Sequence, residues 1–298
     1  MYRIGIDLGG TNTAAGLVDA SGRIVDRDSV KTGLPTTPER IVRDIAGLCR
    51  ALMARNGLEN GDIRSVGVGV PCTADPKRGW MQDADHLGFP GCPLVAPLEE
   101  ALGVPVRIGN DADAAALGEF RGGGYEGESF VLVTLGTGIG GGIILGGRLY
   151  TSVNNAAGEL GHMTIRMDGE HCCCGRCGCF EVYGSATALI RQACEATGEP
   201  ITEAKTVFDR AAAGDLVCVS VLDTYTTYLA EGFANIINIF GPDDLCIGGG
   251  VSAAGDALLI PVREKTYQRV FSKNAKKNTQ IILAQLGNDA GIIGAAFL

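Results

Sequence analysis

A dense group of thiols is the most chemically distinctive stretch of this sequence. Residues 171–181, HCCCGRCGCFE, contain five of the eleven cysteines of the chain within eight positions. Thiolates and imidazoles are the ligands of structural Zn²⁺, so the cluster predicts a zinc site. A redox-active thiol switch is the alternative that the cysteines alone leave open.

Two glycine-rich turns could bind phosphate. One lies at Gly9–Thr11, after an apolar strand, and the other lies in LGTGIGGG at 135–142. Several backbone N–H donors can converge on an oligophosphate where glycine removes the side chain. Gly136, Gly138 and Gly141 also satisfy G-x-G-x-x-G, but a strand follows them, whereas a Rossmann site needs a helix there. Ordinary hairpin turns are the alternative for either turn alone.

Carboxylates stand beside these turns and at the start of one helix. Asp7 ends the first strand, where it could hold Mg²⁺ or simply form a turn. Asn110 and Asp111 open an alanine-rich helix, DADAAALGEF. Such a pair commonly caps a helix, but a phosphotransferase also needs a carboxylate to deprotonate the attacking hydroxyl.

The elements that must position these groups form a repeated plan. Residues 2–25 and 130–150 both predict strand, glycine turn, strand, turn and short strand, which indicates a weak internal duplication. Thr37 and Pro38 mark the start of a helix that ends at Arg55, with Ile41, Ile45, Leu48 and Leu52 on one face. Further elements are a buried strand at 65–71, helices near 185–196, 215–240 and 255–270, and a short packing helix in the tail.

Composition favours a soluble α/β chain of two lobes with a cleft between them. The chain has 298 residues and a formal charge of −9, which argues against nucleic acids and anionic membranes as partners. Residues 130–147 carry no charge, but seven of the eighteen are glycines, so they predict a hairpin and not a membrane span. The start, MYRIGIDLGG, lacks the features of a signal peptide, which predicts a cytoplasmic protein without disulfides.

Six motifs together resemble the ROK family of bacterial sugar kinases, which has the actin-like ATPase (ribonuclease H-like) fold. They cover nearly the whole chain, and GELGH followed by the C-x-C-G-x-x-G-C-x-E pattern is the most specific part. The motifs are DLGGTNT, GNDADAAALGE, LGTGIGGG, AGELGH, CCCGRCGCFE and IGGGVS.

The resemblance implies transfer of the γ-phosphate of Mg-ATP to a hexose, usually at O6, with Asp111 as the general base. A pocket of carboxylate, amide and imidazole groups can saturate the hydroxyls of a sugar with hydrogen bonds. The implied sugar ligands are Asn110, Asp111, Glu159, His162 and Glu181. The implied nucleotide-binding residues are Asp7, Gly9, Gly10, Thr11, Asn12, Thr137, Gly138, Gly249 and Gly250. The implied ligands of structural Zn²⁺ are His162, Cys172, Cys174 and Cys179, which leaves Cys173 and Cys177 surplus.

The resemblance also implies a homodimer and two domains. The first is a small α/β domain at 1–109 on which the C-terminal helix 288–298 packs back. The second is a larger α/β domain at 110–287 that carries the zinc site.

Glucose is the predicted substrate, but other sugars stay open: allose, fructose, mannose, N-acetylmannosamine and N-acetylglucosamine. The sugar-responsive repressors of the family form a different class, a non-catalytic sugar sensor, and carry a helix-turn-helix domain before the first phosphate motif. Asp7 leaves no room for one in this sequence. Two departures from the family pattern concern the sugar side: His86 stands where a sugar-contacting Asn is expected, and YTSVNNAAGE, at 150–159, lacks the usual glycines.

Overall fold

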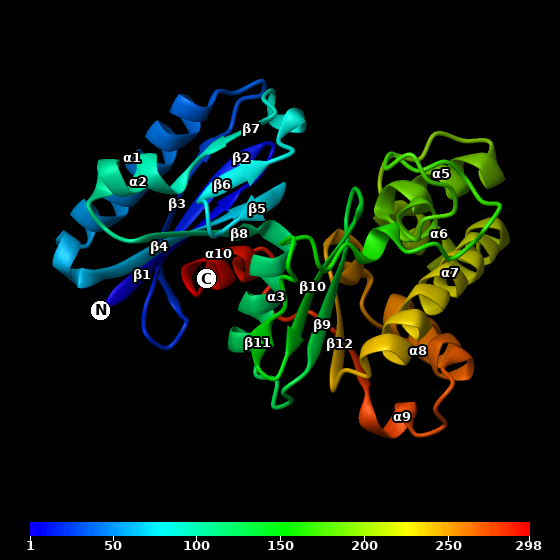
Figure 1. Ribbon diagram of the computed structural model, residues 1–298. Helices are drawn as coiled ribbons and strands as arrows, with labels where there is room; N and C mark the ends of the chain where they lie inside the picture. Colours follow the sequence, from blue (N-terminus) through cyan, green and yellow to red (C-terminus); the bar gives the residue numbers. More distant parts are fainter.

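Two lobes built around two five-stranded sheets make up the chain (Figure 1). The computed structural model describes all 298 residues except for the side chain of His86, so the prediction for that side chain lies outside the described part. The first sheet has the order β3-β2-β1-β4-β8 and the second has the order β11-β10-β9-β12-β13.

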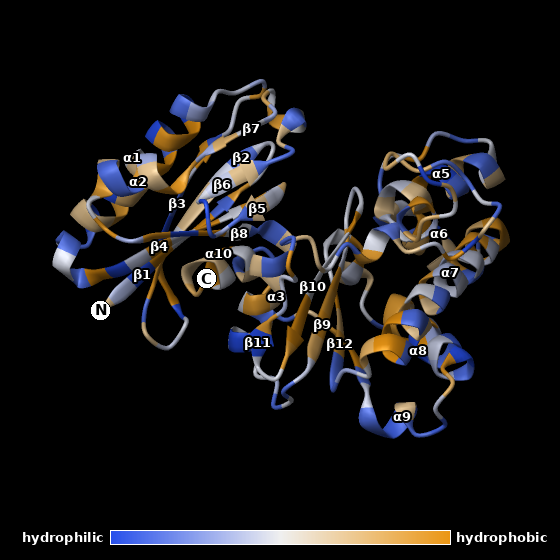
Figure 2. Cartoon of the chain, in the orientation of Figure 1, coloured by the Kyte–Doolittle hydropathy of each residue, from blue (hydrophilic) through white to orange (hydrophobic). Residues whose placement is uncertain are grey.

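Both sheets follow one plan, which confirms the predicted duplication. In each, three antiparallel strands are continued by two parallel ones. The first sheet contains β1 (Tyr2–Leu8), β2 (Asn12–Val18), β3 (Ile24–Lys31), β4 (Ile63–Val70) and β8 (Val106–Asn110). The second contains β9 (Phe130–Leu135), β10 (Ile139–Leu145), β11 (Arg148–Leu149), β12 (Asp244–Gly248) and β13 (Gln280–Leu283). In Figure 2 the strands of the second sheet are largely hydrophobic, whereas the first sheet is mixed, since alternate residues of β3 are exposed.

Helix α1 (Pro38–Arg55) confirms the prediction from periodicity. The Thr37 side chain accepts a hydrogen bond from Arg40 N at 3.3 Å, and Pro38 occupies the first helical position. The predicted apolar face is buried against the first sheet. Helix α2 (Val95–Leu102) was not predicted, because Pro97 lies within it; a proline is tolerated there since the first turn needs no N–H partner. A small sheet of β5 (Thr73–Asp75), β6 (Trp80–Gln82) and β7 (Gly91–Pro93) completes this lobe.

Helix α10 (Asp289–Ala296) joins the two halves of the molecule, because it packs against β1, β4 and α3 (Asp111–Gly122). Its close approach to α3 depends on glycine. A Cβ on Gly118 would overlap the carbonyl of Ala290, and a Cβ on Gly294 would overlap the carbonyl of Ala114. The tail helix is therefore a central packing element and not an appendage.

The remaining helices form one side of the second lobe. They are α4 (Glu181–Gly184), α5 (Ala186–Thr197), α6 (Ala204–Ala212), α7 (Leu216–Phe240), α8 (Asp256–Arg269) and α9 (Ala275–Asn278). The three predicted helices correspond to α5, α7 and α8, whereas α4, α6 and α9 are short and were missed.

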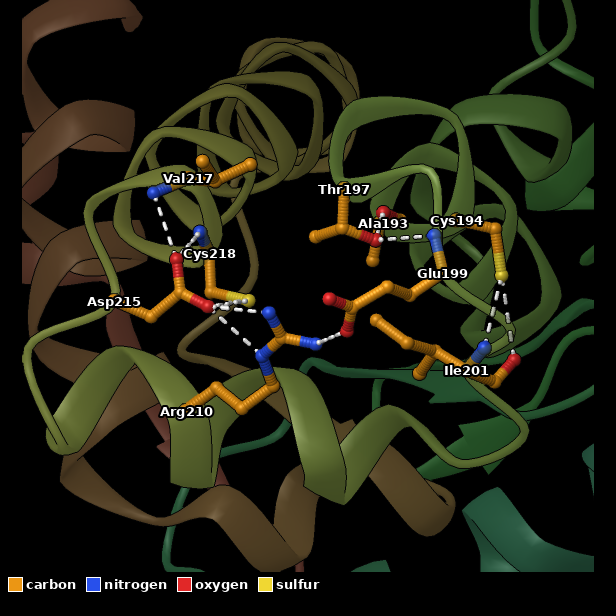
Figure 3. Close-up of polar contacts among 9 residues, drawn as sticks. All are labelled: Ala193, Cys194, Thr197, Glu199, Ile201, Arg210, Asp215, Val217 and Cys218. Carbon is orange, nitrogen blue, oxygen red and sulfur yellow. Dashed lines mark hydrogen bonds and ion pairs between the residues drawn. The ribbon is translucent and has the colours of Figure 1, made fainter.

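One arginine ties α5, α6 and α7 together (Figure 3). Arg210 on α6 pairs with Glu199, just beyond α5, at 2.6 Å and with Asp215 at 2.7 Å. Asp215 is in turn the N-cap of α7, accepting from Val217 N at 2.9 Å. This network holds α5, whose first turn contacts the candidate site. None of the helices in the described residues combines the length and hydrophobicity needed to cross a membrane.

Candidate active site and thiol cluster

A cavity of about 710 Å³ contains seven of the predicted site residues and draws its lining from both lobes. Asp7 comes from β1, Asp111 from the start of α3 and Glu181 from α4. Glycine turns that include Gly136–Gly138 and Gly248–Gly250 complete the lining. The seven are Asp7, Asp111, Thr137, Gly138, Glu181, Gly249 and Gly250.

The other predicted residues lie outside this lining. Gly9–Asn12 form the β1–β2 turn, closed by a hydrogen bond from Gly9 N to Asn12 O at 2.9 Å. Asn110 ends β8, next to Asp111, while Glu159 precedes the short helical turn Leu160–His162 and His162 ends it. Of the two turns predicted to bind phosphate, the structure brings the second, at 135–142, to the cavity with the carboxylates. The first, Gly9–Asn12, is not part of the cavity lining.

Asp111 is a buried carboxylate with an altered acidity. Burial, followed by the nearby charges of Asp7 and Glu159, raises its pKa to about 6. One of its oxygens, Oδ1, accepts from Ala112 N at 2.8 Å. A carboxyl group with this pKa is mostly ionised at neutral pH yet more basic than a surface aspartate, which suits a general base. Burial also raises the pKa of Asp7.

Asn110 is the helix cap that its position suggested. Its Oδ1 accepts from Ala112 N at 2.9 Å and from Asp113 N at 3.2 Å, while its Nδ2 donates to Cys72 O at 3.3 Å. The cap fixes the first turn of α3 and with it the direction of Asp111. Asn110 can therefore cap the helix and also contribute to the candidate site.

Glu181 contacts the second glycine turn. The sequence predicted the turn but not this contact. Its Oε2 accepts from Ile139 N at 2.9 Å. A Cβ on Gly138 would overlap the same carboxylate. The start of α5 also holds this turn, because Thr187 Oγ1 donates to Thr137 O at 2.8 Å. The turn and Glu181 thus form one unit, although they lie more than forty residues apart in the sequence.

Asp113 is a further buried carboxylate, behind the cavity lining, for which no role was predicted. Its side chain is 4% exposed, and its Oδ1 has no hydrogen-bond partner. Burial, followed by the charges of Glu159 and Asp111, raises its pKa to about 7. The available signal was its place in the first turn of α3, two residues after Asp111.

Glu119 was also missed. It is 1% exposed and accepts from Gln285 N at 3.1 Å and Leu286 N at 2.7 Å. Both donors precede Gly287 and Asn288, which line the cavity. Glu119 therefore anchors the loop that forms this part of the cavity wall to the far end of α3.

Two residues other than glycine in the segment before Glu159 adopt backbone conformations that favour glycine. Ser152 has a φ of 64° and Asn155 has a φ of 56°. Asparagine tolerates this left-handed region better than serine does. Two residues of YTSVNNAAGE, Ser152 and Asn155, therefore adopt a conformation that favours glycine.

His162, Cys172, Cys174 and Cys179 converge as a metal site requires. Their ligand atoms all lie within 4.8 Å of one another. His162 Nδ1 lies 3.6 Å from Cys172 Sγ, and the Sγ atoms of Cys174 and Cys179 are also 3.6 Å apart. Metal bonds of about 2.3 Å to sulfur and 2.0 Å to nitrogen place tetrahedral ligands roughly 3.5–3.8 Å apart. The four predicted ligands therefore fit Zn²⁺.

Comparisons with known proteins place the chain in a family. A family model described as "ROK family" matches residues 3–298. The chain is 38% identical to a glucokinase of Streptomyces coelicolor, covering 99% of this chain and 96% of the relative. It is 35% identical to a glucokinase of Halalkalibacterium halodurans, covering 100% of this chain and 94% of the relative.

Among solved structures, a ROK family glucokinase from Streptomyces griseus, in complex with glucose and AMPPNP, is similar with a TM-score of 0.82. It is 36% identical, and the match covers 100% of this chain and 98% of that one. This likeness confirms the predicted two-lobed, actin-like fold.

Proposed function

The chain belongs to the ROK family, and from this membership and the buried carboxylates of the cavity we propose that it is an ATP-dependent glucokinase. The observation that carries the proposal is Asp111. It combines a buried carboxyl group of raised pKa with a place beside a glycine turn in a cavity shared by both lobes. That combination suits deprotonation of a hydroxyl next to a bound phosphate.

In the proposed reaction Asp111 accepts the proton of the glucose 6-hydroxyl. The hydroxyl oxygen forms a bond to the γ-phosphorus as the bond between that phosphorus and the bridging oxygen of ADP breaks. Four further side chains are proposed to bind the remaining hydroxyls, each with hydrogen bonds that carboxylate, amide or imidazole groups can make. They are Asn110, Glu159, His162 and Glu181.

The glycine turns are proposed to hold the nucleotide. Gly9–Asn12 and Thr137–Gly138 would donate backbone N–H groups to the phosphates, and Gly249 and Gly250 would lie against the adenosine. Both of these glycines line the cavity. Mg²⁺, when bound with ATP, neutralises phosphate charge, and Asp7 is proposed to orient it.

Structural Zn²⁺ is proposed at His162, Cys172, Cys174 and Cys179, on the distances given above. The metal site lies on the segment between Glu159 and Glu181, so it would fix both proposed sugar ligands. His162 turns Nδ1 toward the sulfurs, which leaves Nε2 as its hydrogen-bonding atom for a sugar. The homodimer, the cytoplasmic location and the division into domains at 1–109 with 288–298 and at 110–287 also stay proposals.

ATP consumption with a panel of sugars tests the substrate. Glucose should give the highest kcat/KM against mannose, fructose, allose, N-acetylglucosamine and N-acetylmannosamine. The same assay on Asp111→Asn should show a kcat at least about 10²-fold lower, the usual scale for loss of a general base, while ATP still binds. A folded Asp111→Asn enzyme with the kcat of the wild type would exclude Asp111 as the base. A higher kcat/KM for another sugar would exclude glucose as the preferred substrate.

A further inference from the structure

A second group of metal-binding atoms adjoins the proposed zinc site. It consists of Cys172, Cys173 and Glu181, whose ligand atoms also lie within 4.8 Å of one another. The Sγ atoms of Cys172 and Cys173 are 3.9 Å apart, and Cys173 Sγ lies 3.7 Å from Glu181 Oε1. A tetrahedral ion with sulfur at about 2.3 Å and oxygen at about 2.1 Å separates its ligands by roughly 3.6–3.8 Å. The second group therefore has nearly the spacing of a metal site without any rearrangement.

We propose that Cys173, Glu181 and a shared Cys172 thiolate form a second, inhibitory site for a thiophilic divalent cation such as Zn²⁺ or Cd²⁺. Cys172 would bridge this ion and the structural one. Sulfur ligands select soft or borderline ions over Mg²⁺, so the Mg²⁺ needed with ATP would not fill this site.

The three residues differ in exposure in a way that favours reversible binding. Cys173 is exposed, Glu181 is half-buried and Cys172 is buried. Only two of the Glu181 lone-pair regions are engaged, because Oε2 accepts from Ile139 N and Oε1 faces Cys173. An ion can thus reach Cys173 from solvent and bind Oε1 while Oε2 keeps its place on the turn.

Binding there would remove Glu181 from the sugar. A carboxylate oxygen that ligates a metal no longer accepts a hydrogen bond from a sugar hydroxyl with the same strength. The expected kinetic pattern is competition with the sugar and not with ATP. This pattern rests on the proposed function, since it takes Glu181 as a sugar ligand, whereas the metal site itself does not.

Cys177 provides a matched control. It is another thiol of the same loop outside the proposed zinc set, and its Sγ lies 3.3 Å from His171 Nδ1. It belongs to neither group of converging ligand atoms found in the described residues. Cys177→Ser removes one thiol just as Cys173→Ser does, and both leave the four structural ligands intact.

The experiment titrates the purified zinc-containing protein with Cd²⁺ and Zn²⁺ and measures bound metal per chain directly. Wild type and Cys177→Ser should take up about one further ion per chain, and Cys173→Ser should take up none. Retention of the second ion by Cys173→Ser, or its loss from Cys177→Ser, overturns the site. This readout stands whether or not the protein phosphorylates glucose.

Kinetics at free Zn²⁺ concentrations set by a metal buffer test the inhibition. The apparent KM for the sugar should rise at least about tenfold in wild type at saturating metal, with the KM for ATP unchanged. Cys173→Ser should have the activity of the wild type without added metal and lose this rise. Metal binding that leaves the KM for the sugar unchanged, or raises the KM for ATP instead, overturns the inhibitory role.

Discussion

Replacing Asp113 by Asn should stabilise the protein, and more at high pH than at low pH. Asp113 is a buried carboxyl group whose pKa is raised from 3.8 to about 7. Because the pKa is higher in the folded than in the unfolded chain, folding is favoured most when the group is protonated. That advantage is present in full below pH 3.8 and is lost as the pH rises through 7.

The magnitude follows from the two pKa values. Relative to the protonated state, the free-energy penalty on folding is about 2 kcal/mol at pH 5 and about 4 kcal/mol at pH 8. An asparagine side chain cannot ionise, so Asp113→Asn removes the penalty at both pH values. Any change in packing caused by the amide is the same at both pH values, so the pH-dependent gain is about 2–3 kcal/mol. Over 298 residues this corresponds to roughly 4 °C in Tm.

Thermal unfolding of wild type and Asp113→Asn at pH 5 and pH 8 measures this difference. The control is Asp168→Asn, which removes an equal charge from an exposed loop position and should leave the difference between the two pH values unchanged. A gain in Tm for Asp113→Asn that is equal at both pH values, or larger at pH 5, would show that the carboxyl group does not carry a buried charge.

Three further predictions concern the site. The kcat/KM for glucose should fall about tenfold per pH unit below about pH 6, where Asp111 becomes protonated; a flat profile down to pH 5 would contradict its role as the base. Gly138→Ala should raise the KM for sugar far more than Gly136→Ala, because its Cβ would overlap Glu181 while a Cβ on Gly136 meets nothing within 4 Å; equal KM values would refute the coupling. At low free zinc, elemental analysis should find about one zinc per chain in wild type and none in Cys174→Ser, whose Tm should fall; a zinc-free wild type that is active and is reversibly inactivated by oxidation favours a thiol switch.

Much of the fold could be predicted because its signals are local. The helix start at Thr37, the glycine turns between strands and the cap at Asn110 each depend on residues within a few positions of one another. The three antiparallel strands that open each sheet were visible as a repeated pattern. The cysteine cluster suggested a metal site, the family resemblance implied the four ligands, and the structure brings their ligand atoms together.

Short helices were less predictable, because their stability comes from packing and not from their own sequence. Helix α6 is nine residues long and is held by Arg210, which reaches two carboxylates beyond its ends. Helix α2 contains Pro97, which on its own argues against a helix. In both cases tertiary contacts outweighed weak local preference.

The chemistry of the individual carboxylates depended entirely on contacts between distant segments. Motifs identified Asp111 and Glu181, but the pKa of Asp111 comes from burial beside Asp7 and Glu159, which lie far from it in the chain. The contact of Glu181 with the Gly138 turn and the burial of Asp113 likewise arise only when α3, β10 and α4 pack together. Desolvation and charge–charge coupling act through space over a few ångströms, so residue types and their spacing indicate which groups are present, whereas packing sets how each one titrates and what it touches.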